Sequence, residues 1–375
     1  MTRCPSGRRS TSTDLPLTLT RVLDPALAGF DDVIDVRSPA EYAEDHLPGA
    51  ISLPVLDDAE RARVGTIFKQ VSPFDARKVG GALVAVNAAR HVAGPLADKT
   101  GAWRGLVYCW RGGQRSGSFT TILSQIGWRV DRIEGGYKAW RALVVDRVQN
   151  RAVPAPVIVL DGNTGSAKTA ILGRLAARGW QVIDLEGLAN HRGSLFGGRP
   201  DGQPGQKRFE GRLAVALETL DPARPVLVEA ESSRIGAVTV PKAMWQAICA
   251  APRLRLEVPL AARAAYTAAT YDDMVDDPHR VAATVSALSH LHPADRSAQW
   301  QAAVAAGDWC GLAEGLLRDH YDPRYRKHRL RHADHERAVV ALDRLHDLEG
   351  ATGRVEAALV RLAGPGGGTG REGAS

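Results

Sequence analysis

The chain has 375 residues, which is long enough for two domains of ordinary size, each with its own core. Hydrophobic residues make up 44% of the sequence and charged residues 24%, a composition that excludes a chain disordered throughout. The formal net charge of +6 favours polyanionic partners without requiring one, and no apolar stretch reaches the ~18–20 residues that a membrane-spanning helix needs.

The cysteines and the first residues favour a cytoplasmic protein. Cys4, Cys109, Cys249 and Cys310 have the spacing of neither a disulfide framework nor a zinc site. Residues 1–9 carry positive charge, but no apolar segment follows them, so no secretory signal is expected. We therefore expect a reducing, cytoplasmic location and no membrane partner.

The predicted elements alternate between strands and helices in two successive domains. Predicted strands are residues 33–36, 106–108 and 128–130, and then residues 157–160, 181–184, 226–229 and 254–258. Helical patterns separate these strands, so we expect parallel sheets with ligands at the carboxyl ends of the strands. From about residue 261 the pattern is mostly helical. The expected organisation is a flexible tail at 1–14, a first domain at 15–145, a linker at 146–156, a second domain at 157–362 and a disordered tail at 363–375.

A cysteine loop follows the strand 106–108 and precedes the helical run 118–126. It reads Cys-Trp-Arg-Gly-Gly-Gln-Arg-Ser from Cys109 onward. Backbone N–H groups and the helix N-terminus converge in such a loop, so we expect a lowered pKa and a nucleophilic thiolate at Cys109. The alternative is a buried, inert cysteine, against which the paired glycines and flanking arginines argue. The residues expected to bind an anion in this loop are Arg111, Gly112, Gly113 and Arg115.

Three further segments make the first domain resemble the rhodanese family, sulfurtransferases whose loop cysteine carries sulfur as a persulfide. They are residues 33–42, 46–50 and 134–140, in that order and spacing. Asp35, Arg37 and His46 we interpret as scaffold, namely a buried ion pair and a turn histidine. The Cys-x5-Arg spacing also resembles the phosphatase branch of the fold, although Tyr108 replaces the histidine usual before that branch's cysteine. Residues 60–93 form an insertion that we expect to pack across the site or against the other domain.

A phosphate-binding loop opens the second domain. Residues 162–169, Gly-Asn-Thr-Gly-Ser-Ala-Lys-Thr, lie between the strand 157–160 and the helical run 170–178, which is the required context of a Walker A motif. Ala167 stands where the motif has its second glycine. A methyl group is tolerable at this position if the residue has a negative φ, which we therefore expect. The alternative is a glycine-rich turn without a ligand. The expected phosphate-binding residues are Gly162, Gly165, Ser166, Lys168 and Thr169, with Thr169 also a candidate ligand of Mg²⁺.

Acidic and basic residues elsewhere are further candidates. Glu229 and Glu231 end the strand 226–229 and are expected to act as a base or to hold Mg²⁺ through water, unless they are helix N-cap acids. In the basic run 324–332, Tyr325 is expected to stack on a base, the alternative being a solvated helix face. The candidate contacts for a phosphate group or a nucleic acid are His191, Arg192, Arg263, Arg324, Tyr325, Arg326 and Lys327.

The whole chain resembles the tRNA 2-selenouridine synthase family, in which a rhodanese domain is fused to a P-loop domain. The resemblance rests on residues 108–113, 161–169, 184–194, 229–232 and 320–325. It implies an α/β fold, with a rhodanese-like parallel-sheet domain followed by a P-loop NTPase-like domain that has a helical C-terminal part.

The activity that this resemblance implies is replacement of sulfur by selenium in wobble 2-thiouridine of tRNA. Selenophosphate would be the donor, and an S-geranyl intermediate would form from geranyl diphosphate. The implied partners are tRNA and a selenophosphate synthetase, with no tightly bound cofactor. The residues fit this chemistry, since Lys168 could stabilise departing diphosphate and Cys109 could present selenium as a perselenide.

Three other functions fit parts of the pattern. One is an ATP-dependent rhodanese-type tRNA sulfurtransferase, which would use the P-loop for a nucleotide. Another is an RNA-binding module in which a degenerate P-loop senses a nucleotide. The third is a cysteine-dependent phosphatase.

Overall fold

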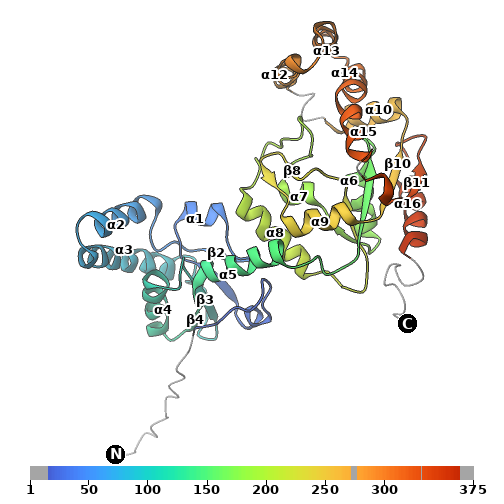
Figure 1. The fold of residues 1–375 in the computed structure, drawn as a ribbon. Helices are drawn as coiled ribbons and strands as arrows, with labels where there is room; N and C mark the ends of the chain where they lie inside the picture. Colours follow the sequence, from blue (N-terminus) through green and yellow to red (C-terminus); the bar gives the residue numbers. More distant parts are fainter. Residues whose placement is uncertain (1–15, 272–276, 331, 364–375) are drawn as a thin grey trace, which may run out of the picture. The chain divides into compact units, whose positions relative to one another are not determined.

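The computed structural model describes residues 16–271, 277–330 and 332–363, except for the side chains of residues 328 and 329. The chain divides into two compact units, Met1–Val145 and Asp146–Ser375, which are described separately (Figure 1). Both contain a parallel sheet covered by helices, so the predicted α/β fold class is confirmed. In the described ranges, no helix combines the length and the apolar character that crossing a membrane requires.

The first unit is built on a four-stranded parallel sheet in the order β2-β1-β3-β4. Ile34 pairs with Val107, and both side chains lie in a core completed by Phe119 and Leu123 of α4. The strands are β1 (Asp32–Asp35), β2 (Ile51–Ser52), β3 (Arg104–Tyr108) and β4 (Arg129–Arg132). The helices are η1 (Pro25–Gly29), α1 (Pro39–Glu44), α2 (Asp58–Gln70), α3 (Pro73–Ala93), α4 (Gln114–Ile126) and α5 (Gly136–Val145).

The expected insertion, residues 60–93, forms most of the helical hairpin α2–α3. Asp57 and Glu60 form a capping box at the start of α2, and Ser72 with the following proline begins α3. Helix α3 packs on α4 and places Val84 in the core, while Asn87 donates a hydrogen bond to the carbonyl of Val55 at 3.1 Å. The hairpin is therefore an integral part of the first unit.

The second unit has a five-stranded parallel sheet in the order β11-β10-β5-β7-β6. From the central β5 the chain passes to one side for β6 and β7 and then to the other side for β10 and β11. Ligands in such sheets bind where the direction reverses, which here is the loop after β5. The strands are β5 (Val157–Gly162), β6 (Gln181–Ile183), β7 (Val226–Glu229), β10 (Arg253–Glu257) and β11 (Glu336–Ala341). A short antiparallel pair is formed by β8 (Arg234–Ile235) and β9 (Val238–Thr239).

Helices cover both faces of this sheet and continue into a separate helical layer with its own apolar cluster (Figure 1). The helices packed around the sheet are α6 (Lys168–Ala177), α7 (Leu185–Ala189), α8 (Gln206–Glu218), α9 (Lys242–Ala250), α10 (Leu260–Thr270) and α16 (Leu348–Ala363). The helical layer consists of α12 (Pro278–Ala287), η3 (Ser289–Leu291), α13 (Ala294–Ala306), α14 (Trp309–Leu316), η4 (Leu317–Tyr321), α15 (Asp322–Leu330) and the short η5 (Ala333–His335).

Strand β11 is an exception in the region after residue 261, which is mostly helical as expected. It joins the sheet beside β10, with Val340 buried and its neighbours more exposed. An edge strand of this kind contains few buried positions, so its sequence has only a weak strand pattern.

The expected linker and tails differ in how much the structure describes of them. In the expected linker, residues 146–150 form a π-helical turn, η2 (Asp146–Asn150), that belongs to the second unit. Arg147 is buried there and pairs with Glu218, with 3.3 Å between Nε and Oε1. The two tails expected at residues 1–14 and 363–375 lie outside the described residues, apart from residue 363.

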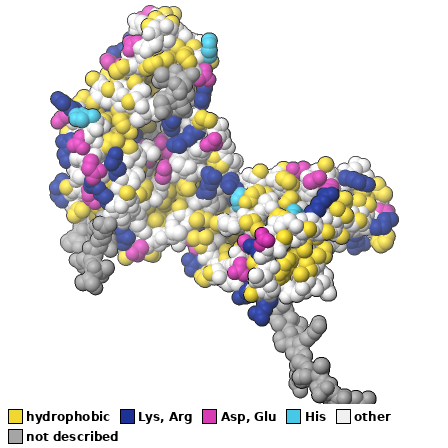
Figure 2. Space-filling view, turned by 180° about the vertical axis from the view of Figure 1, so that it is seen from behind, with side chains coloured by type: hydrophobic (Ala, Val, Ile, Leu, Met, Phe, Trp, Pro, Cys, Tyr) yellow, Lys and Arg dark blue, Asp and Glu magenta, His cyan; other side chains and the backbone are white. Residues whose placement is uncertain are grey.

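The surface does not concentrate the net positive charge on the face drawn in Figure 2. Basic and acidic side chains are interspersed there on each unit. On this face, polyanion binding is therefore better sought at particular sites than over the whole surface.

Candidate active sites

The cysteine loop of the first unit lies between the end of β3 and the start of α4, as expected. The turn at Gly135 and Gly136 packs directly behind it, and Tyr137 N donates to the carbonyl of Cys109 at 2.9 Å. Gly136 has a φ of +57°, and a Cβ atom there would meet the carbonyl oxygen of Cys109 at 2.2 Å and the amide of Gly112 at 2.6 Å. The loop is thus held in shape by a turn that only glycine can form.

Cys109 lies at the floor of this loop and is 3% exposed. Its Sγ lies 3.1 Å from Oγ of Ser116, whose hydroxyl also lies 3.2 Å from the carbonyl of Gly113. The single proton of that hydroxyl can therefore go either to the carbonyl or to a sulfur anion. In the described part of the chain, no group accepts a hydrogen bond from the amides of Arg111, Gly112 or Gly113, which leaves them available to an anion.

The two arginines of the loop are placed differently from each other. Arg111 is exposed, whereas Arg115 binds the carboxylate of Glu41 with distances of 2.7 and 3.4 Å. Arg61 of α2 also contacts Glu41, at 3.2 Å, so the inserted hairpin reaches the neighbourhood of the cysteine loop. Burial alone would raise the pKa of Glu41, but Arg115 lowers it below the usual value. In this structure Arg115 interacts with Glu41 and does not turn into the loop as expected of an anion clamp.

The three residues interpreted as scaffold are confirmed in that role. Arg37 and Asp35 form a fully buried ion pair of 2.7 Å, and the Arg37 guanidinium also lies 4.0 Å from the ring centroid of Tyr137. His46 lies with Nδ1 2.8 Å from the carbonyl of Tyr42 and stacks on the tyrosine ring. These contacts hold the loop after β1 in place.

The phosphate-binding loop of the second unit links β5 to α6. Gly165 has a φ of +82°, and a Cβ there would meet Oγ1 of Thr267 at 2.5 Å and the carbonyl of Arg263 at 2.9 Å. Ala167 has a φ of +60°, so the expectation of a negative φ at this position is wrong. An alanine in the left-handed region costs roughly 1 kcal/mol and is retained here because its neighbours bury it.

This loop also presents unpartnered amides. Within the described ranges, no group accepts a hydrogen bond from the N–H of Gly165, Ala167 or Lys168. Lys168 is buried, with Nζ 3.0 Å from the carbonyl of Gly162 and 3.6 Å from Oε1 of Glu229. Burial would lower the pKa of Lys168, but Tyr325 and the nearby glutamates raise it, so the ammonium charge persists. Amides, a lysine and a helix N-terminus together form an anion cradle.

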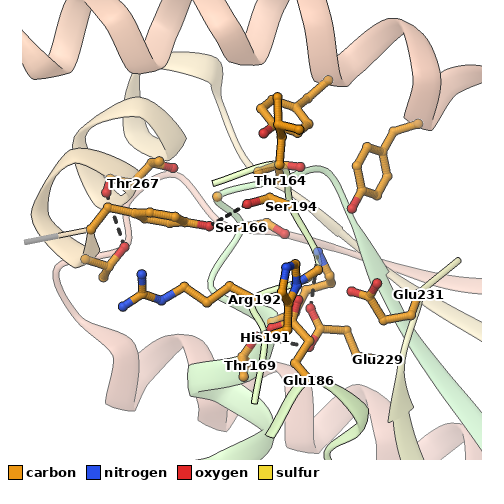
Figure 3. Close-up of a pocket in the computed structure, with 18 of the residues that line it drawn as sticks. Thr164, Ser166, Thr169, Glu186, His191, Arg192, Ser194, Glu229, Glu231 and Thr267 are labelled. Atoms are coloured by element: carbon orange, nitrogen blue, oxygen red, sulfur yellow. Dashed lines mark hydrogen bonds and ion pairs between the residues drawn. The ribbon is translucent and has the colours of Figure 1, made fainter. Parts of the chain in front are cut away.

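Three buried carboxylates face one another beside the cradle (Figure 3). Glu229 and Glu231 were expected at this position, whereas Glu186 was not identified from the sequence. The sequence signal for Glu186 is weak, because this residue lies in the short helix α7. That helix follows β6, the strand next to β7 in the sheet. The Thr169 hydroxyl lies 3.0 Å from Oε2 of Glu229 and 3.2 Å from Oε2 of Glu186.

Burial raises the pKa of each of these three carboxyls, and their mutual repulsion raises those of Glu186 and Glu231 further. Their ligand oxygens lie within 4.8 Å of one another, and oxygen atoms are the ligands that Mg²⁺ prefers. The group of Thr169, Glu186 and Glu229 therefore fits a magnesium ion. A bound cation would offset the repulsion among the carboxylates.

The loop after α7 covers the carboxylates with two of the expected contact residues, His191 and Arg192 (Figure 3). Gly193 approaches the acids so closely that a Cβ would meet Oε1 of Glu186 at 2.5 Å. Burial and Arg199 lower the pKa of His191, whose Nδ1 accepts a hydrogen bond from Gly193 N at 3.1 Å. The Arg192 guanidinium lies 4.8 Å from the ring centroid of Tyr271.

Arg263 has a different role from the expected contact with phosphate or tRNA. It is buried and binds both carboxylate oxygens of Asp322, at 2.9 and 2.7 Å. It also donates to the carbonyls of Val258 and Thr164, at 3.1 and 3.2 Å. The guanidinium therefore fixes the phosphate-binding loop from behind.

The basic run begins in helix α15, and its members point in different directions. Tyr325 lies inside the pocket, with its ring centroid 5.7 Å from Nζ of Lys168, so it is not free on the surface to stack on a base as expected. Burial raises the pKa of Tyr325 to about 12. Arg324 lines the same pocket and contacts Nε2 of His320. Arg326 and Lys327 are exposed, as expected of residues that contact an RNA backbone.

These residues enclose a pocket of about 750 Å³. One wall carries the phosphate cradle and the carboxylates, and another carries cations from the loop after α7 and from α15. A diphosphate ester fits this arrangement, since the cradle takes the phosphates and the carboxylates can hold a cation or accept a proton. The polar and charged residues of the pocket include Thr164, Ser166, Lys168, Thr169, Glu186, His191, Arg192, Ser194, Arg199, Glu229, Glu231, Ser232, His320 and Arg324.

Comparisons with known proteins match both units. A family model described as a tRNA 2-selenouridine synthase AAA domain matches residues 155–293, and a rhodanese-like domain model matches residues 20–143. The chain is 33% identical over 332 residues to the tRNA 2-selenouridine synthase of Alcanivorax borkumensis, covering 78% of this chain and 88% of that protein. It is 40% identical over 256 residues to the protein of the same name from Aeromonas salmonicida, covering 67% of each.

A solved structure, TT1252 from Thermus thermophilus, is also similar to parts of this chain. It is 19% identical with a TM-score of 0.23, over 55% of this chain and 98% of that one. A likeness this distant does not bear on function.

Proposed function

Because the chain belongs to the tRNA 2-selenouridine synthase family, a family of tRNA-modifying enzymes, we propose that it replaces the sulfur of wobble 2-thiouridine by selenium from selenophosphate, through an S-geranyl intermediate made from geranyl diphosphate. The observation that supports this most is the presence of two anion cradles in one chain. Each follows a parallel strand and precedes a helix, one containing the thiol of Cys109 and the other the ammonium of Lys168. The proposal assigns one reaction step to each cradle.

Alkylation takes place at the cradle of Lys168. The 2-thiouridine sulfur attacks C1 of geranyl diphosphate, the C1–O bond breaks, and diphosphate leaves with the bonding electrons. Lys168 and the loop amides stabilise the charge that develops on the leaving group. The N3 proton of the base is lost in this step, and Glu231, with a pKa raised by burial and by Glu229, is the proposed acceptor.

A magnesium ion, where bound by Thr169, Glu186 and Glu229, would supply positive charge near the departing diphosphate. The residues around that position orient the ester without it. Arg192, Arg199 and Arg324 line the same pocket and neutralise phosphate oxygens that the P-loop does not reach.

Selenium transfer takes place at the cradle of Cys109. A perselenide on this cysteine would require a two-electron oxidant, because selenophosphate already carries selenium at the selenide level. We therefore assign a balanced step in which the Cys109 sulfur attacks phosphorus, the P–Se bond breaks, and selenide leaves with the bonding electrons. The unpartnered loop amides and the Ser116 hydroxyl beside Sγ support this assignment.

The released selenide then attacks C2 of the S-geranylated base, the C2–S bond breaks, and geranylthiol departs after taking up a proton. Water hydrolyses the phosphocysteine. Since Cys109 is 3% exposed, selenophosphate reaches Sγ only after the atoms that cover the sulfur move aside. In this scheme a selenophosphate synthetase supplies the donor, and exposed cations such as Arg326 and Lys327 contact the tRNA in the cytoplasm.

The test is reconstitution with purified protein and a tRNA that carries 2-thiouridine, followed by mass spectrometry of the nucleosides. Geranyl diphosphate alone is expected to give S-geranyl-2-thiouridine without ATP, and addition of selenophosphate is expected to convert it to 2-selenouridine. Selenouridine formed without geranyl diphosphate would refute the proposed route. Thiolation that depends on ATP hydrolysis would favour the sulfurtransferase alternative.

A further inference from the structure

A second, smaller cavity adjoins the phosphate-binding pocket of the second unit. Its volume is about 80 Å³, room for roughly six water molecules at ~10–15 Å³ each. It shares five residues with the larger pocket and continues from it into the helical layer. The shared residues are Thr164, Ser194, Thr267, Tyr271 and Tyr321.

The walls beyond this junction are aliphatic and aromatic. Helix α14 supplies most of them, and η4, α10, α12 and the loop after α7 supply the rest. Several of these side chains are at the same time part of the apolar clusters of the helical layer, so their positions are fixed by packing. The residues that close the cavity are Val281, Trp309, Leu312, Ala313, Leu316 and Leu317.

Two hydroxyl groups at the junction have no partner within the described residues. Oγ1 of Thr267 and the hydroxyl of Tyr321 are buried, and neither forms a hydrogen bond there. Leaving a buried hydroxyl unpaired destabilises the fold, so such groups are usually satisfied by a ligand or water. Figure 3 shows Thr164, Ser194 and Thr267 grouped on one side of the pocket, with the three glutamates on the other.

We propose that this cavity is the subsite for the hydrocarbon chain of a prenyl diphosphate, and that its closed end limits the length of the chain. This inference rests on the proposed function, which places the diphosphate on the loop from Gly162 to Thr169. The unpartnered hydroxyls of Thr267 and Tyr321 then lie where the polar head of the ester joins the chain, and they donate to its oxygens.

The chemistry of the walls favours a hydrocarbon chain over a nucleotide base. A base buried in this cavity would leave its ring nitrogens and exocyclic groups without partners, because the polar atoms are confined to the junction. A branched aliphatic chain needs no partners, and each buried methylene strengthens binding roughly fourfold. The apolar end therefore discriminates between a prenyl diphosphate and a nucleoside triphosphate.

Ala268, on α10, offers a way to fill the cavity without touching the cradle. It lines the cavity but not the larger pocket, whereas its neighbour Ala269 is exposed and lines neither. Ala268→Leu and Ala269→Leu make the same change on the same helix, one inside the cavity and one outside. Trp309→Leu makes the complementary change, since it removes part of the closed end.

The experiment measures dissociation constants of the full chain by calorimetry, without tRNA, for inorganic diphosphate, geranyl diphosphate and farnesyl diphosphate. The wild type is expected to bind geranyl diphosphate at least tenfold more tightly than diphosphate. Ala268→Leu should weaken the binding of geranyl diphosphate at least tenfold and change the affinity for diphosphate less than twofold. Ala269→Leu should change neither affinity. Trp309→Leu should bring farnesyl diphosphate to the affinity of the shorter ester.

Other outcomes would overturn the assignment. Equal affinity of the wild type for diphosphate and its geranyl ester would show that the chain finds no subsite. A loss for both ligands in Ala268→Leu would show that this residue acts on the cradle. If the wild type geranylates tRNA while Ala268→Leu binds geranyl diphosphate normally, the proposed function stands and this chain subsite does not.

Discussion

At the scale of single residues, the hydrogen bonds around His320 determine its protonation. Arg324 can only donate, so Nε2 of His320 must accept and the ring proton lies on Nδ1. Nδ1 lies 2.9 Å from Nε2 of His292, which therefore accepts in turn. Burial, Arg324 and His292 lower the pKa of His320 to about 4. The ring is neutral in the folded chain and keeps Arg324 at the edge of the pocket.

A pH-dependent stability follows from that neutral histidine. In the unfolded chain the imidazole binds a proton below about pH 6.5, whereas in the folded chain it does so only below about pH 4. His320 should therefore contribute a loss of about 1–2 kcal/mol of stability at pH 5, whereas Glu186, Glu229 and Glu231 act in the opposite direction because their raised pKa values favour the folded state as the pH falls. The difference between the wild type and His320→Gln, in urea unfolding at pH 7.5 and 5, isolates the contribution of the histidine.

His320→Gln should remove the destabilising contribution of His320 at pH 5, because the substituted side chain does not titrate. His279→Gln, on the exposed surface of α12, provides the matched control and should leave the dependence unchanged. The account of His320 would be wrong if both variants and the wild type lost the same stability between the two pH values.

Which site residues can be predicted from sequence depends on how local their signal is. Cys109, Lys168 and Thr169 lie in loops whose order of strand, loop and helix is contained in a few consecutive residues. Glu186 joins Glu229 only because β6 and β7 are neighbours in the sheet, which a single sequence does not reveal.

The same limit explains the residues that were assigned a different environment. Arg263 was expected at a phosphate, but its carboxylate partner Asp322 is 59 residues away in the chain. Tyr325 was expected on a solvated surface, but the helical layer directs it toward Lys168. The positive φ of Ala167 is likewise a consequence of tertiary packing around the loop.

At the scale of elements, two close-packed segments define the cysteine loop, one carrying Cys109 and one carrying the Gly135–Gly136 turn. Gly136→Ala would place a methyl group against backbone atoms of the cysteine loop, which cannot shift without disrupting the loop. It would also hold an alanine at a positive φ, which is a strained conformation. We expect this variant to lose about 2–4 kcal/mol of unfolding free energy in the first unit and to lose selenium transfer with it. Chemical unfolding monitored by circular dichroism measures the loss.

Gly81→Ala provides the contrasting control in the same unit. Gly81 lies exposed in α3, and an added Cβ would meet no atom within 4 Å. Because alanine is a better helix former than glycine, this variant should gain about 0.5–1 kcal/mol. A loss in Gly81→Ala as large as that in Gly136→Ala would show that the turn has no special role.

Element prediction succeeded for the central strands and for the edge strands β4 and β6, and it missed the edge strands β2 and β11. The central strands β3, β5 and β7 have continuous apolar runs, and their positions agree with the expectation within a few residues. Strand β11 begins with two charged residues at the sheet edge and has one buried position, Val340, so it was missed. The α2–α3 hairpin was recognised as ordered, but its packing on α4 depends on contacts distant in sequence.

At the scale of the whole molecule, each unit has its own core and its own anion cradle. We therefore expect two thermal transitions in calorimetry of the full chain. Inorganic diphosphate should raise the transition temperature of the second unit only. At one hundred times its dissociation constant it should add up to about 2.7 kcal/mol to the unfolding free energy of that unit. Gly136→Ala should lower only the other transition. A single transition that both perturbations shift together would contradict this independence.

The central claim is that Lys168 and Cys109 act in successive steps on one uridine. The most direct test is nucleoside mass spectrometry of 2-thiouridine tRNA incubated with geranyl diphosphate and selenophosphate and with Cys109→Ser, Lys168→Met or the control Cys310→Ser. Cys109→Ser should accumulate S-geranyl-2-thiouridine without 2-selenouridine, Lys168→Met should leave 2-thiouridine unchanged, and Cys310→Ser should behave as the wild type. Selenouridine at the wild-type level in Cys109→Ser, or undiminished geranylation in Lys168→Met, would contradict the claim.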